Sequence, residues 1–359
     1  MESSNSRAEE LAAPLNDLPH VDFCCAYGSS LLPNNSNKKP MVDYILGVSD
    51  PMQWHSQNLE KNRHHYGSFL AYLGSRTITQ VADEIGVGVH FNPYVRFEDK
   101  VIKYGVIRMH DLLQDVLTWN RFYISGRLQK PVHILVDSLD VGNVNLVNLK
   151  AAASAALLLL PSEFNEEDLY AKICSLSYMG DLRMLFAEDK NKAKSIVSGS
   201  LDKFRQLYTP FLCEFDTKGL LKFSPTGDPD SKIVQDCSLS AACSLVSFLP
   251  ATVQSRMCAE LGEKQYMSES GLFSFPFFIM KPCHNDPAYV IIQLCIGRLR
   301  RQVVVPSKGA AAKCMEKALR RLVAVSSTRQ AVSGFFAAGG VNAGRYLVSK
   351  ISKALSSRS

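Results

Sequence analysis

The stretch from Phe23 to Val48, FCCAYGSSLLPNNSNKKPMVDYILGV, decides the fold. Its first five residues form an apolar run with the composition of a strand, which stops at Gly28. A polar, proline-containing segment follows, and a second strand-like run begins at Met41 and carries one carboxylate, Asp43. An unpaired carboxylate in an apolar environment is costly, so Asp43 needs a cationic partner. The sequence therefore predicts two strands, with Asp43 held by a metal ion.

The turn after the first strand has the composition of a phosphate-binding loop. Glycine lacks a Cβ, so the backbone N–H groups of Gly28, Ser29 and Ser30 can approach a phosphate closely. An aspartate on the neighbouring strand could hold Mg²⁺ against the same phosphate. A Gly-Ser turn alone is more often only a turn, but its position before Asp43 favours nucleotide binding.

Gly28-Ser29 followed by Asp43 resembles the signature of the nucleotidyltransferase superfamily. Further motifs follow in order along the chain: AYGSS, VDYILGVSDP, QWHSQNLEKNRHHY, IKYGVI, YISGRLQKPV, LLLLPSEFNEEDLY and SYMGDLRMLFAEDKNKAKSIV. Together they resemble the mitochondrial translocator assembly and maintenance protein family, from Val21 to about Phe211 and weakly near 326–334. That family is understood as the mitochondrial phosphatidate cytidylyltransferase, which makes CDP-diacylglycerol and pyrophosphate from CTP and phosphatidic acid and so feeds cardiolipin synthesis.

The resemblance implies an α+β fold with Mg²⁺ as cofactor. A nucleotidyltransferase-like domain with a mixed sheet is expected at 20–144, after a flexible arm at 1–19. A helical, winged-helix-like domain is expected at 145–215. An extension with a basic helix (216–325) and a membrane-contacting tail (326–359) complete the expected organisation.

The predicted metal site departs from the superfamily pattern at one position. That pattern has a second acid two residues after the first, on the same strand face, and here the position is Ile45. The second ligand must therefore come from elsewhere, and the sequence does not choose between Asp50, Asp137, Asp140 and Asp181. We predict a metal site of Asp43, Asp50 and Asp140, with the other two acids as alternatives.

The remaining candidate site residues belong to the later motifs. The resemblance implies that Asp181 and Arg183 act with Asp43 in catalysis, although a Gly-Asp turn is a common structural feature. Arg127 follows Gly126, and Lys103 lies two residues before Gly105, both at strand or turn ends, where loops carry binding groups. The predicted nucleotide-binding residues are Gly28, Ser29, Ser30, Lys103, Tyr104, Arg127 and Lys190.

The implied reaction needs little acid–base help. A phosphate monoester loses its second proton near pH 6, so phosphatidate is already a dianionic nucleophile. The difficulty is to bring it against a triphosphate, and Mg²⁺ with Lys and Arg would offset the repulsion. We therefore assign no histidine as a catalytic base.

The composition and charge of the chain limit the kinds of partner that it can bind. The 359 residues carry a formal charge of +6, but thirteen Lys or Arg and a single acid, Glu316, follow from Arg298 to the end. Such an end favours an anionic partner, either nucleic acid or an anionic membrane. The ten cysteines show no metal-binding spacing, which indicates reduced thiols. No apolar run approaches the roughly 20 residues that a bilayer requires.

The tail has the pattern of a short amphipathic membrane segment. The predicted membrane-contacting residues are Phe335, Phe336, Arg345, Tyr346, Leu347, Lys350, Ile351, Lys353 and Leu355. The resemblance implies the matrix side of the mitochondrial inner membrane, peripheral association and no nucleic acid partner, whereas the acidic N-terminus lacks the pattern of a transit peptide. Two alternatives stay open: a non-catalytic scaffold for protein translocation, and a nucleotidyltransferase that acts on nucleic acid or a small molecule.

Overall fold

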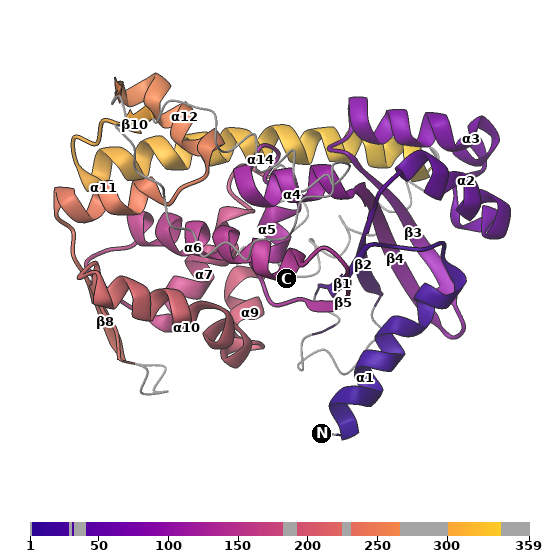
Figure 1. The fold of residues 1–359 in the computed structure, drawn as a ribbon, viewed down its shortest axis with the longest axis horizontal. Helices are drawn as coiled ribbons and strands as arrows, with labels where there is room; N and C mark the ends of the chain where they lie inside the picture. Colours follow the sequence, from indigo (N-terminus) through magenta and orange to yellow (C-terminus); the bar gives the residue numbers. More distant parts are fainter. Residues whose placement is uncertain are drawn as a thin grey trace, which may run out of the picture.

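The computed structural model describes residues 2–28, 31, 41–181, 192–224, 231–265 and 301–338. Its centre is a five-stranded mixed sheet in the order β3-β4-β2-β1-β5. The strands are β1 (Phe23–Tyr27), β2 (Val42–Val48), β3 (Val89–Phe97), β4 (Lys100–Arg108) and β5 (His133–Asp137). Strands β2 and β4 are parallel and the other pairs are antiparallel. The α+β class with a mixed sheet is confirmed (Figure 1).

The register of the sheet places the Gly28 turn beside Asp43. Tyr27 at the end of β1 pairs with Asp43 at the start of β2, and Asp43 pairs with Lys103 on β4. Paired residues point to the same face of a sheet, so these three side chains share one face.

The alternation along β1 and β2 builds one core on each face of the sheet. Phe23, Cys25 and Ile45 pack with buried residues of α4 (Met109–Thr118) and α5 (Ser125–Leu128). Cys24 and Leu46 pack on the other face, beneath three elements. These elements are α1 (Glu2–Ala12), the 3-10 helix η1 (Ala13–Asp17) and α2 (Pro51–Lys61).

The segment 53–73, which reads as one helix from its apolar spacing, is broken into several. The observed elements are α2, η3 (Arg63–His65) and the first part of α3 (Ser68–Gln80), which the π-helical turn η4 (Val81–Ile85) follows. Asn62 ends α2, and its amide donates to the Asp17 carbonyl at 2.7 Å and to Asn58 Oδ1 at 2.9 Å. Gly74 has φ 83°, and α3 is kinked at this residue. A residue with a side chain would disfavour this backbone conformation.

A buried polar network lies between α2, η3 and the sheet. The Asn58 amide donates to the hydroxyls of Tyr66 and Tyr104, each at 2.9 Å. His55 Nδ1 lies 2.9 Å from the Tyr66 hydroxyl, and His65 Nδ1 lies 2.8 Å from that of Tyr104. Tyr104 is therefore fully committed to packing on this face of the sheet.

Burial lowers the pKa of three histidines in this region. The pKa of His55 lies well below its usual range, and that of His90 falls to about 4, in both cases chiefly through desolvation. The pKa of His65 also falls to about 4, from desolvation first and then from the neighbouring His64. His90 Nε2 contacts Asn92 Oδ1 at 3.1 Å, while His90 Nδ1 has no hydrogen-bond partner in the described residues.

We therefore expect stability to fall in mild acid. The unfolded chain takes up protons on His65 and His90 as the pH drops below about 6.5, whereas the folded chain does not until about pH 4. Across that window His90 alone costs up to about 3 kcal/mol. Urea titrations from pH 7.5 to 4.5 measure the slope, and a His90→Asn variant should flatten it. An unchanged slope would show that His90 is not buried in its neutral form.

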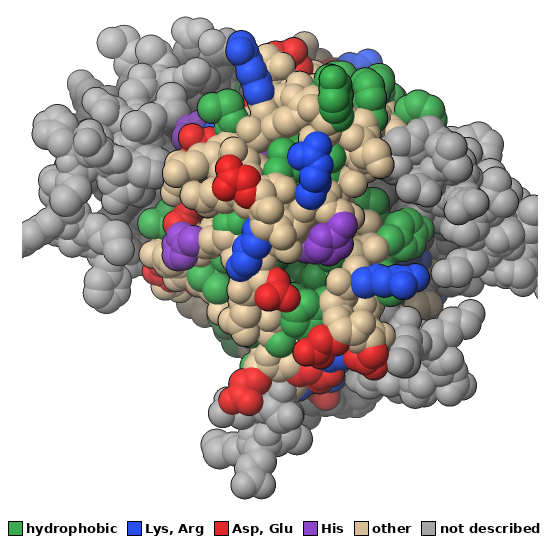
Figure 2. Space-filling view, turned by 90° about the vertical axis from the view of Figure 1, so that its right-hand side faces the viewer, with side chains coloured by type: hydrophobic (Ala, Val, Ile, Leu, Met, Phe, Trp, Pro, Cys, Tyr) green, Lys and Arg blue, Asp and Glu red, His purple; other side chains and the backbone are tan. Residues whose placement is uncertain are grey.

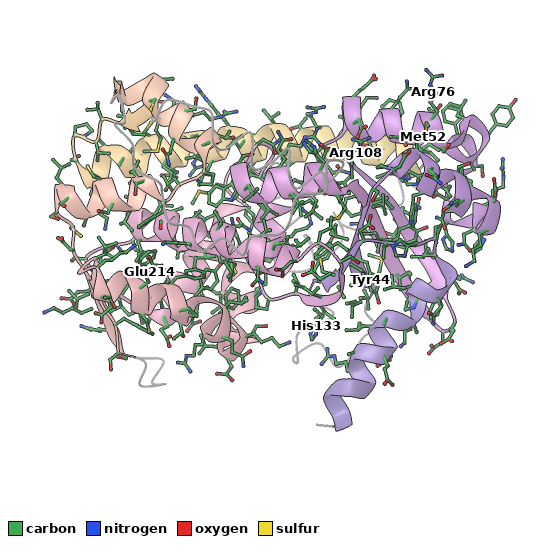
Figure 3. All side chains as sticks on the ribbon, in the orientation of Figure 1. Tyr44, Met52, Arg76, Arg108, His133 and Glu214 are labelled. Atoms are coloured by element: carbon green, nitrogen blue, oxygen red, sulfur yellow. The ribbon has the colours of Figure 1, made fainter. Side chains whose placement is uncertain are left out.

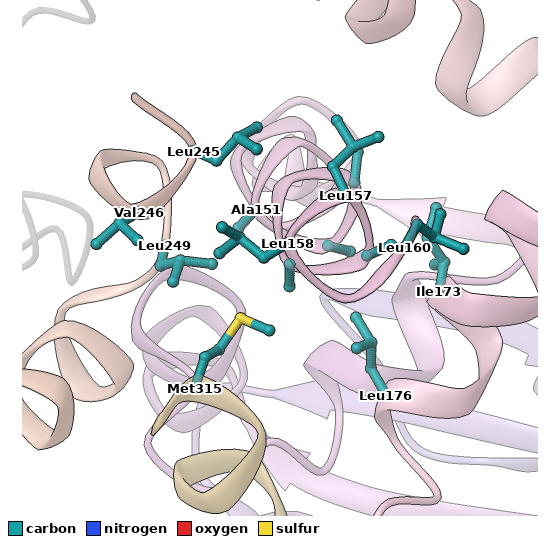
Figure 4. Packing of buried hydrophobic residues seen from close by; sticks show 14 of the residues in the cluster. Ala151, Leu157, Leu158, Leu160, Ile173, Leu176, Leu245, Val246, Leu249 and Met315 are labelled. Atoms are coloured by element: carbon teal, nitrogen blue, oxygen red, sulfur yellow. The ribbon is translucent and has the colours of Figure 1, made fainter. Parts of the chain in front are cut away.

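The rest of the chain forms a helical part beside the sheet. Its helices are α6 (Val141–Leu159), α7 (Glu166–Leu176), α9 (Lys192–Ser198), α10 (Leu201–Thr217), α11 (Leu239–Ser247) and α12 (Ala251–Leu261). Its strands are β6 (Glu163–Asn165), β7 (Leu221–Lys222) and β8 (Lys232–Gln235), in the order β6-β8-β7, with the pair β9 (Glu263–Gln265) and β10 (Arg301–Val303). The small-residue helix α6 runs through the core, where Ala151, Leu157 and Leu158 meet side chains of α7 and α11 (Figure 4).

A single long helix, α14 (Lys308–Ala338), connects the helical part to the sheet part (Figure 1). Met315 and Leu319 lie in the helical core, whereas Arg329 donates to the carbonyls of Glu84 at 2.7 Å and Ile85 at 3.1 Å beside α3. The helix crosses the predicted boundary at 325/326 without a break. Residues 326–338 of the predicted tail therefore belong to the folded body, where Ser333 and Ala337 are buried.

Candidate active site

Asp43 lies at the end of the sheet, directly beside the Gly28 turn. A Cβ placed on Gly28 would lie 3.0 Å from Asp43 Oδ2, and Gly28 has φ +106°. Only glycine allows this close approach at this backbone conformation. Asp43 Oδ1 lies 3.6 Å from Lys103 Nζ, and both side chains are 24% exposed. Lys103 Nζ also lies 4.5 Å from the centroid of the Phe91 ring.

Arg127 on α5 is held between two aromatic rings on the same side of the sheet. Its guanidinium lies 3.8 Å from the centroid of Tyr123 and 5.6 Å from that of Tyr27. Arg127 Nη1 also donates to the Tyr123 carbonyl at 2.5 Å. Burial raises the pKa of Tyr27, with Arg127 acting in the opposite direction and Asp43 in the same one. Tyr27 thus links the carboxylate and the guanidinium electrostatically.

A second group of cations, Lys130 and Lys192, lies over the ring of Tyr178. Lys130 Nζ donates to the Gly126 carbonyl at 2.8 Å and to the Ser177 hydroxyl at 2.7 Å. Lys130 and Lys192 both lie over the ring of Tyr178, at 4.8 and 5.3 Å from its centroid. Sequence reasoning missed Lys192 and Tyr178 as site residues, although both lie in a motif that carries the resemblance.

Asp115 shapes the loop that precedes Arg127. Its carboxylate accepts from the backbone N–H groups of Arg121, Phe122, Tyr123, Ile124 and Ser125, at 2.7 to 3.1 Å. The Ser125 hydroxyl donates to the same carboxylate at 3.2 Å. Sequence reasoning missed this residue. An acid in phase with the apolar residues of α4, which is 1% exposed, was the available signal.

Two of the predicted metal ligands lie far from Asp43. Asp50 follows the opposite end of β2, where Oδ1 accepts from Met52 N at 2.9 Å and caps α2. A strand of this length separates the two acids by about 20 Å. Asp50 therefore cannot share an ion with Asp43.

Asp140 and the alternative Asp137 also lie at that opposite end, because Asp137 pairs with Phe23. The Asp137 carboxylate accepts from Val141 N at 2.7 Å and Gly142 N at 2.9 Å, while Asp140 Oδ2 accepts from Asn143 Nδ2 at 2.8 Å. Both acids thus serve the start of α6, and the structure does not bring Asp43, Asp50 and Asp140 together at one site. The described residues contain no group of three metal-ligating side chains.

Tyr104, a predicted nucleotide-binding residue, does not share the face of the sheet that carries Asp43 and Lys103. It pairs with Tyr44, next to the pair of Lys103 with Asp43, so its side chain points to the other face of the sheet. There it is fully buried and bonded within the polar network.

Asp181 is buried at 3% exposure in the turn after α7, and its backbone N–H donates to the Tyr178 carbonyl at 3.2 Å. It stays a candidate from the sequence. Several predicted residues lie outside the described part of the chain: Ser29, Ser30, Arg183, Lys190, Arg345, Tyr346, Leu347, Lys350, Ile351, Lys353 and Leu355. Phe335 and Phe336 are described, and both are exposed on α14, at 57% and 43%.

The side of the molecule that carries α2 and α3 differs from the sheet end. Figure 2 shows acidic and basic side chains intermixed there with exposed hydrophobic ones. At the sheet end, Lys103 pairs with Asp43 and Arg127 lies against Tyr27, while Lys130 and Lys192 lie over the ring of Tyr178. No helix in the described part of the chain is long and apolar enough to cross a membrane.

The fold and the site define an α+β protein in which one carboxylate and basic side chains lie beside a glycine turn at the end of a mixed sheet. A family model described as "Phosphatidate cytidylyltransferase, mitochondrial" matches residues 11–353. The chain belongs to that family.

Individual relatives carry the same description. The chain is 46% identical over 197 residues to the mitochondrial phosphatidate cytidylyltransferase of Danio rerio, which covers 53% of this chain and 58% of that protein. It is 45% identical over 200 residues to the Homo sapiens protein, covering 54% and 44%. With the Schizosaccharomyces pombe protein the identity is 31% over 343 residues, covering 94% and 81%. The chain thus matches about half the length of the vertebrate relatives.

Proposed function

We propose that this chain transfers CMP from CTP to phosphatidic acid and releases pyrophosphate, which makes CDP-diacylglycerol. The observation that carries the proposal is the contact between the Gly28 turn and Asp43, with Lys103 and Arg127 on the same side of the sheet. Membership of the family supports the choice of both substrates.

The residues of the site fit a Mg²⁺ ion that is held largely by its substrate. Mg²⁺ is commonly bound through one or two carboxylates together with substrate phosphates. Asp43 supplies one partly exposed carboxylate, directly beside a turn where phosphate oxygens can come close. When bound, Mg²⁺ would neutralise charge on the triphosphate.

The side chains have distinct tasks in this proposal. The Gly28 turn admits the phosphates to the backbone, and Lys103 keeps the charge of Asp43 balanced before substrate arrives. Arg127, fixed by Tyr123 and Tyr27, stabilises the charge that develops on the departing pyrophosphate. The phosphatidate phosphate attacks the α-phosphorus, and the bond to the pyrophosphate oxygen breaks. No general base is required, because the nucleophile is already a dianion.

The proposed lipid substrate also indicates where in the cell the chain acts. A phosphatidate anchored by acyl chains requires the enzyme to meet a membrane. We propose the inner membrane of the mitochondrion, and the family description supports the mitochondrion. Exposed Phe335 and Phe336 suit peripheral contact. The helical part, with the three-stranded sheet β6-β8-β7, supports a winged-helix-like domain.

The function is tested by pyrophosphate release. The chain is incubated with CTP and Mg²⁺, together with vesicles that contain phosphatidate, or RNA, or no acceptor. We expect release with phosphatidate alone, accompanied by CDP-diacylglycerol. Release with RNA would instead favour a nucleic-acid enzyme, and no release under any condition would favour the scaffold.

A further inference from the structure

Two lysines meet over one tyrosine at the junction between the sheet and the helical part. Lys130 Nζ lies 4.8 Å from the centroid of the Tyr178 ring, and Lys192 Nζ lies 5.3 Å from it. Lys130 follows α5, Tyr178 follows α7, and Lys192 opens α9. Three separate segments therefore bring two ammonium groups to a single ring, and all three side chains are only partly exposed.

The two parts of the chain approach each other closely at this junction. A Cβ placed on Gly126 of α5 would lie 2.7 Å from Ser177 Cβ, so only glycine lets α5 come this near to the turn after α7. Lys130 Nζ donates to the Ser177 hydroxyl at 2.7 Å and to the Gly126 carbonyl at 2.8 Å. Contacts on both sides of the junction thus fix Lys130 beside Tyr178.

Helix α5 lies on the face of the sheet that carries Asp43. Cys25 and Tyr27 are two residues apart on β1, so their side chains point to one face. Cys25 belongs to the buried cluster that contains Leu128 of α5, and Tyr27 packs against the same cluster. Tyr27 pairs with Asp43, which puts the carboxylate on this face as well. Lys130, directly after α5, therefore lies on the side of Asp43.

The order of the strands gives the direction from Asp43 to the two lysines. Strands β2, β1 and β5 follow one another, and β5 is the edge strand beside the helical part. Figure 3 labels His133 on β5, where Lys203 of α10 lies 3.4 Å from the imidazole. Arg127 lies over Tyr27 of β1, between Asp43 and that edge. The cations therefore follow one another from Asp43 towards the helical part, with Arg127 first and the lysine pair beyond it.

A triphosphate at the Gly28 turn needs more positive charge than the residues nearest to it supply. It carries about four negative charges, of which a Mg²⁺ ion offsets two. Lys103 is already balanced by Asp43, and Arg127 adds one further positive charge. The lysine pair is next in line to supply the rest.

We propose that Lys130 and Lys192, positioned by the ring of Tyr178, bind the terminal phosphates of CTP and hold the pyrophosphate as it departs. The inference deepens the proposed function and rests on it for the identity of the nucleotide. The attacking and leaving oxygens of a phosphoryl transfer lie roughly in line. The phosphatidate phosphate then enters from the opposite side of Asp43, where Lys103 lies on β4.

The test measures binding to the full chain by calorimetry, with Mg²⁺ in the buffer. The probes are inorganic pyrophosphate and soluble dihexanoyl-phosphatidate, each added alone. Lys192→Met should weaken binding of pyrophosphate by about tenfold, because a charge-assisted contact is lost, and should leave the affinity for dihexanoyl-phosphatidate unchanged. Lys192→Arg should restore most of the loss. Lys194→Met, at an exposed lysine of the same helix, is the matched control and should bind pyrophosphate like the wild type.

Substitution of Lys130 provides the second arm. Lys130→Met should also weaken pyrophosphate binding by about tenfold. Because this variant loses the contact with Ser177 as well, Ser177→Ala is its control: it keeps the charge and should bind pyrophosphate like the wild type. If the wild type does not bind pyrophosphate, or if both lysine variants bind it normally, the subsite does not exist. A loss of affinity confined to dihexanoyl-phosphatidate would also overturn the proposal, since it would assign the lysines to the acceptor.

This outcome is separable from failure of the proposed function. Binding of pyrophosphate requires no turnover, so a wild-type chain that makes no CDP-diacylglycerol can still show the subsite. Conversely, an active wild type whose Lys192→Met and Lys130→Met variants bind pyrophosphate normally would overturn only the subsite.

Discussion

Asp43→Asn should reduce the rate of CMP transfer by at least about a thousandfold while leaving the fold intact. The change removes the carboxylate that lies against Gly28, and with it the charge that would hold Mg²⁺ against the triphosphate. Stabilisation by a metal ion is worth several kcal/mol, and each 1.4 kcal/mol is about a factor of ten in rate. The effect of Asp43→Asn on the stability of the fold should be small, because the ion pair of Asp43 with Lys103 is partly exposed and such pairs contribute about 1 kcal/mol or less.

Asp50→Asn is the matched control for this prediction. It makes the same chemical change on the same strand–helix unit, but at the cap of α2. We expect wild-type turnover and a loss of stability below about 1 kcal/mol, since asparagine also caps helices well. Turnover and the Mg²⁺ dependence of CTP binding are measured for both variants. If Asp43→Asn stays within a few-fold of the wild type with unchanged Mg²⁺ dependence, the proposed role of Asp43 is wrong.

The link between Gly28 and Asp43 was predictable because it is local in sequence. The first strand stops at a glycine, and the second strand opens with an acid. Two such strands can pair in only a few registers, and the apolar pattern restricts these registers further. The helix caps were also readable from short segments, because an aspartate before proline or at the end of a strand commonly starts a helix. Asp50 and Asp137 could thus have been assigned as caps, ahead of metal binding.

Other features depend on contacts between distant segments. Lys103 and Tyr104 are adjacent, so only one can face the site, and the sheet register decides which one. The approach of Lys203 to His133 spans 70 residues, and that of Arg329 to Glu84 spans 245. No periodicity or motif encodes such pairs. The apolar spacing of 53–73 suggested one helix, because spacing does not reveal the side-chain hydrogen bonds of Asn62 where α2 ends.

Asp115→Asn should lower the free energy of unfolding by about 3 to 5 kcal/mol, the largest effect expected away from the cation site. The two carboxylate oxygens accept from five backbone N–H groups and one hydroxyl. Asparagine offers one oxygen, and its NH₂ group must then face two or more N–H donors. Each buried donor left without an acceptor costs about 1–3 kcal/mol. The side chain is 1% exposed, so water cannot easily replace the lost acceptor.

The consequence for function follows from the loop that Asp115 holds. Ser125 opens α5, and Tyr123 and Arg127 form one stacked unit on either side of it. Urea unfolding of Asp115→Asn gives the loss of stability, and CTP titration at a temperature where the variant is folded gives the loss of affinity. Asp111→Asn on the same helix is the control, because Asp111 pairs with Arg108 at a partly exposed position and should cost below about 1 kcal/mol. A variant as stable as this control would show that the 121–125 loop is held by other contacts. A destabilised variant that binds CTP normally would show that Arg127 is positioned by its rings alone.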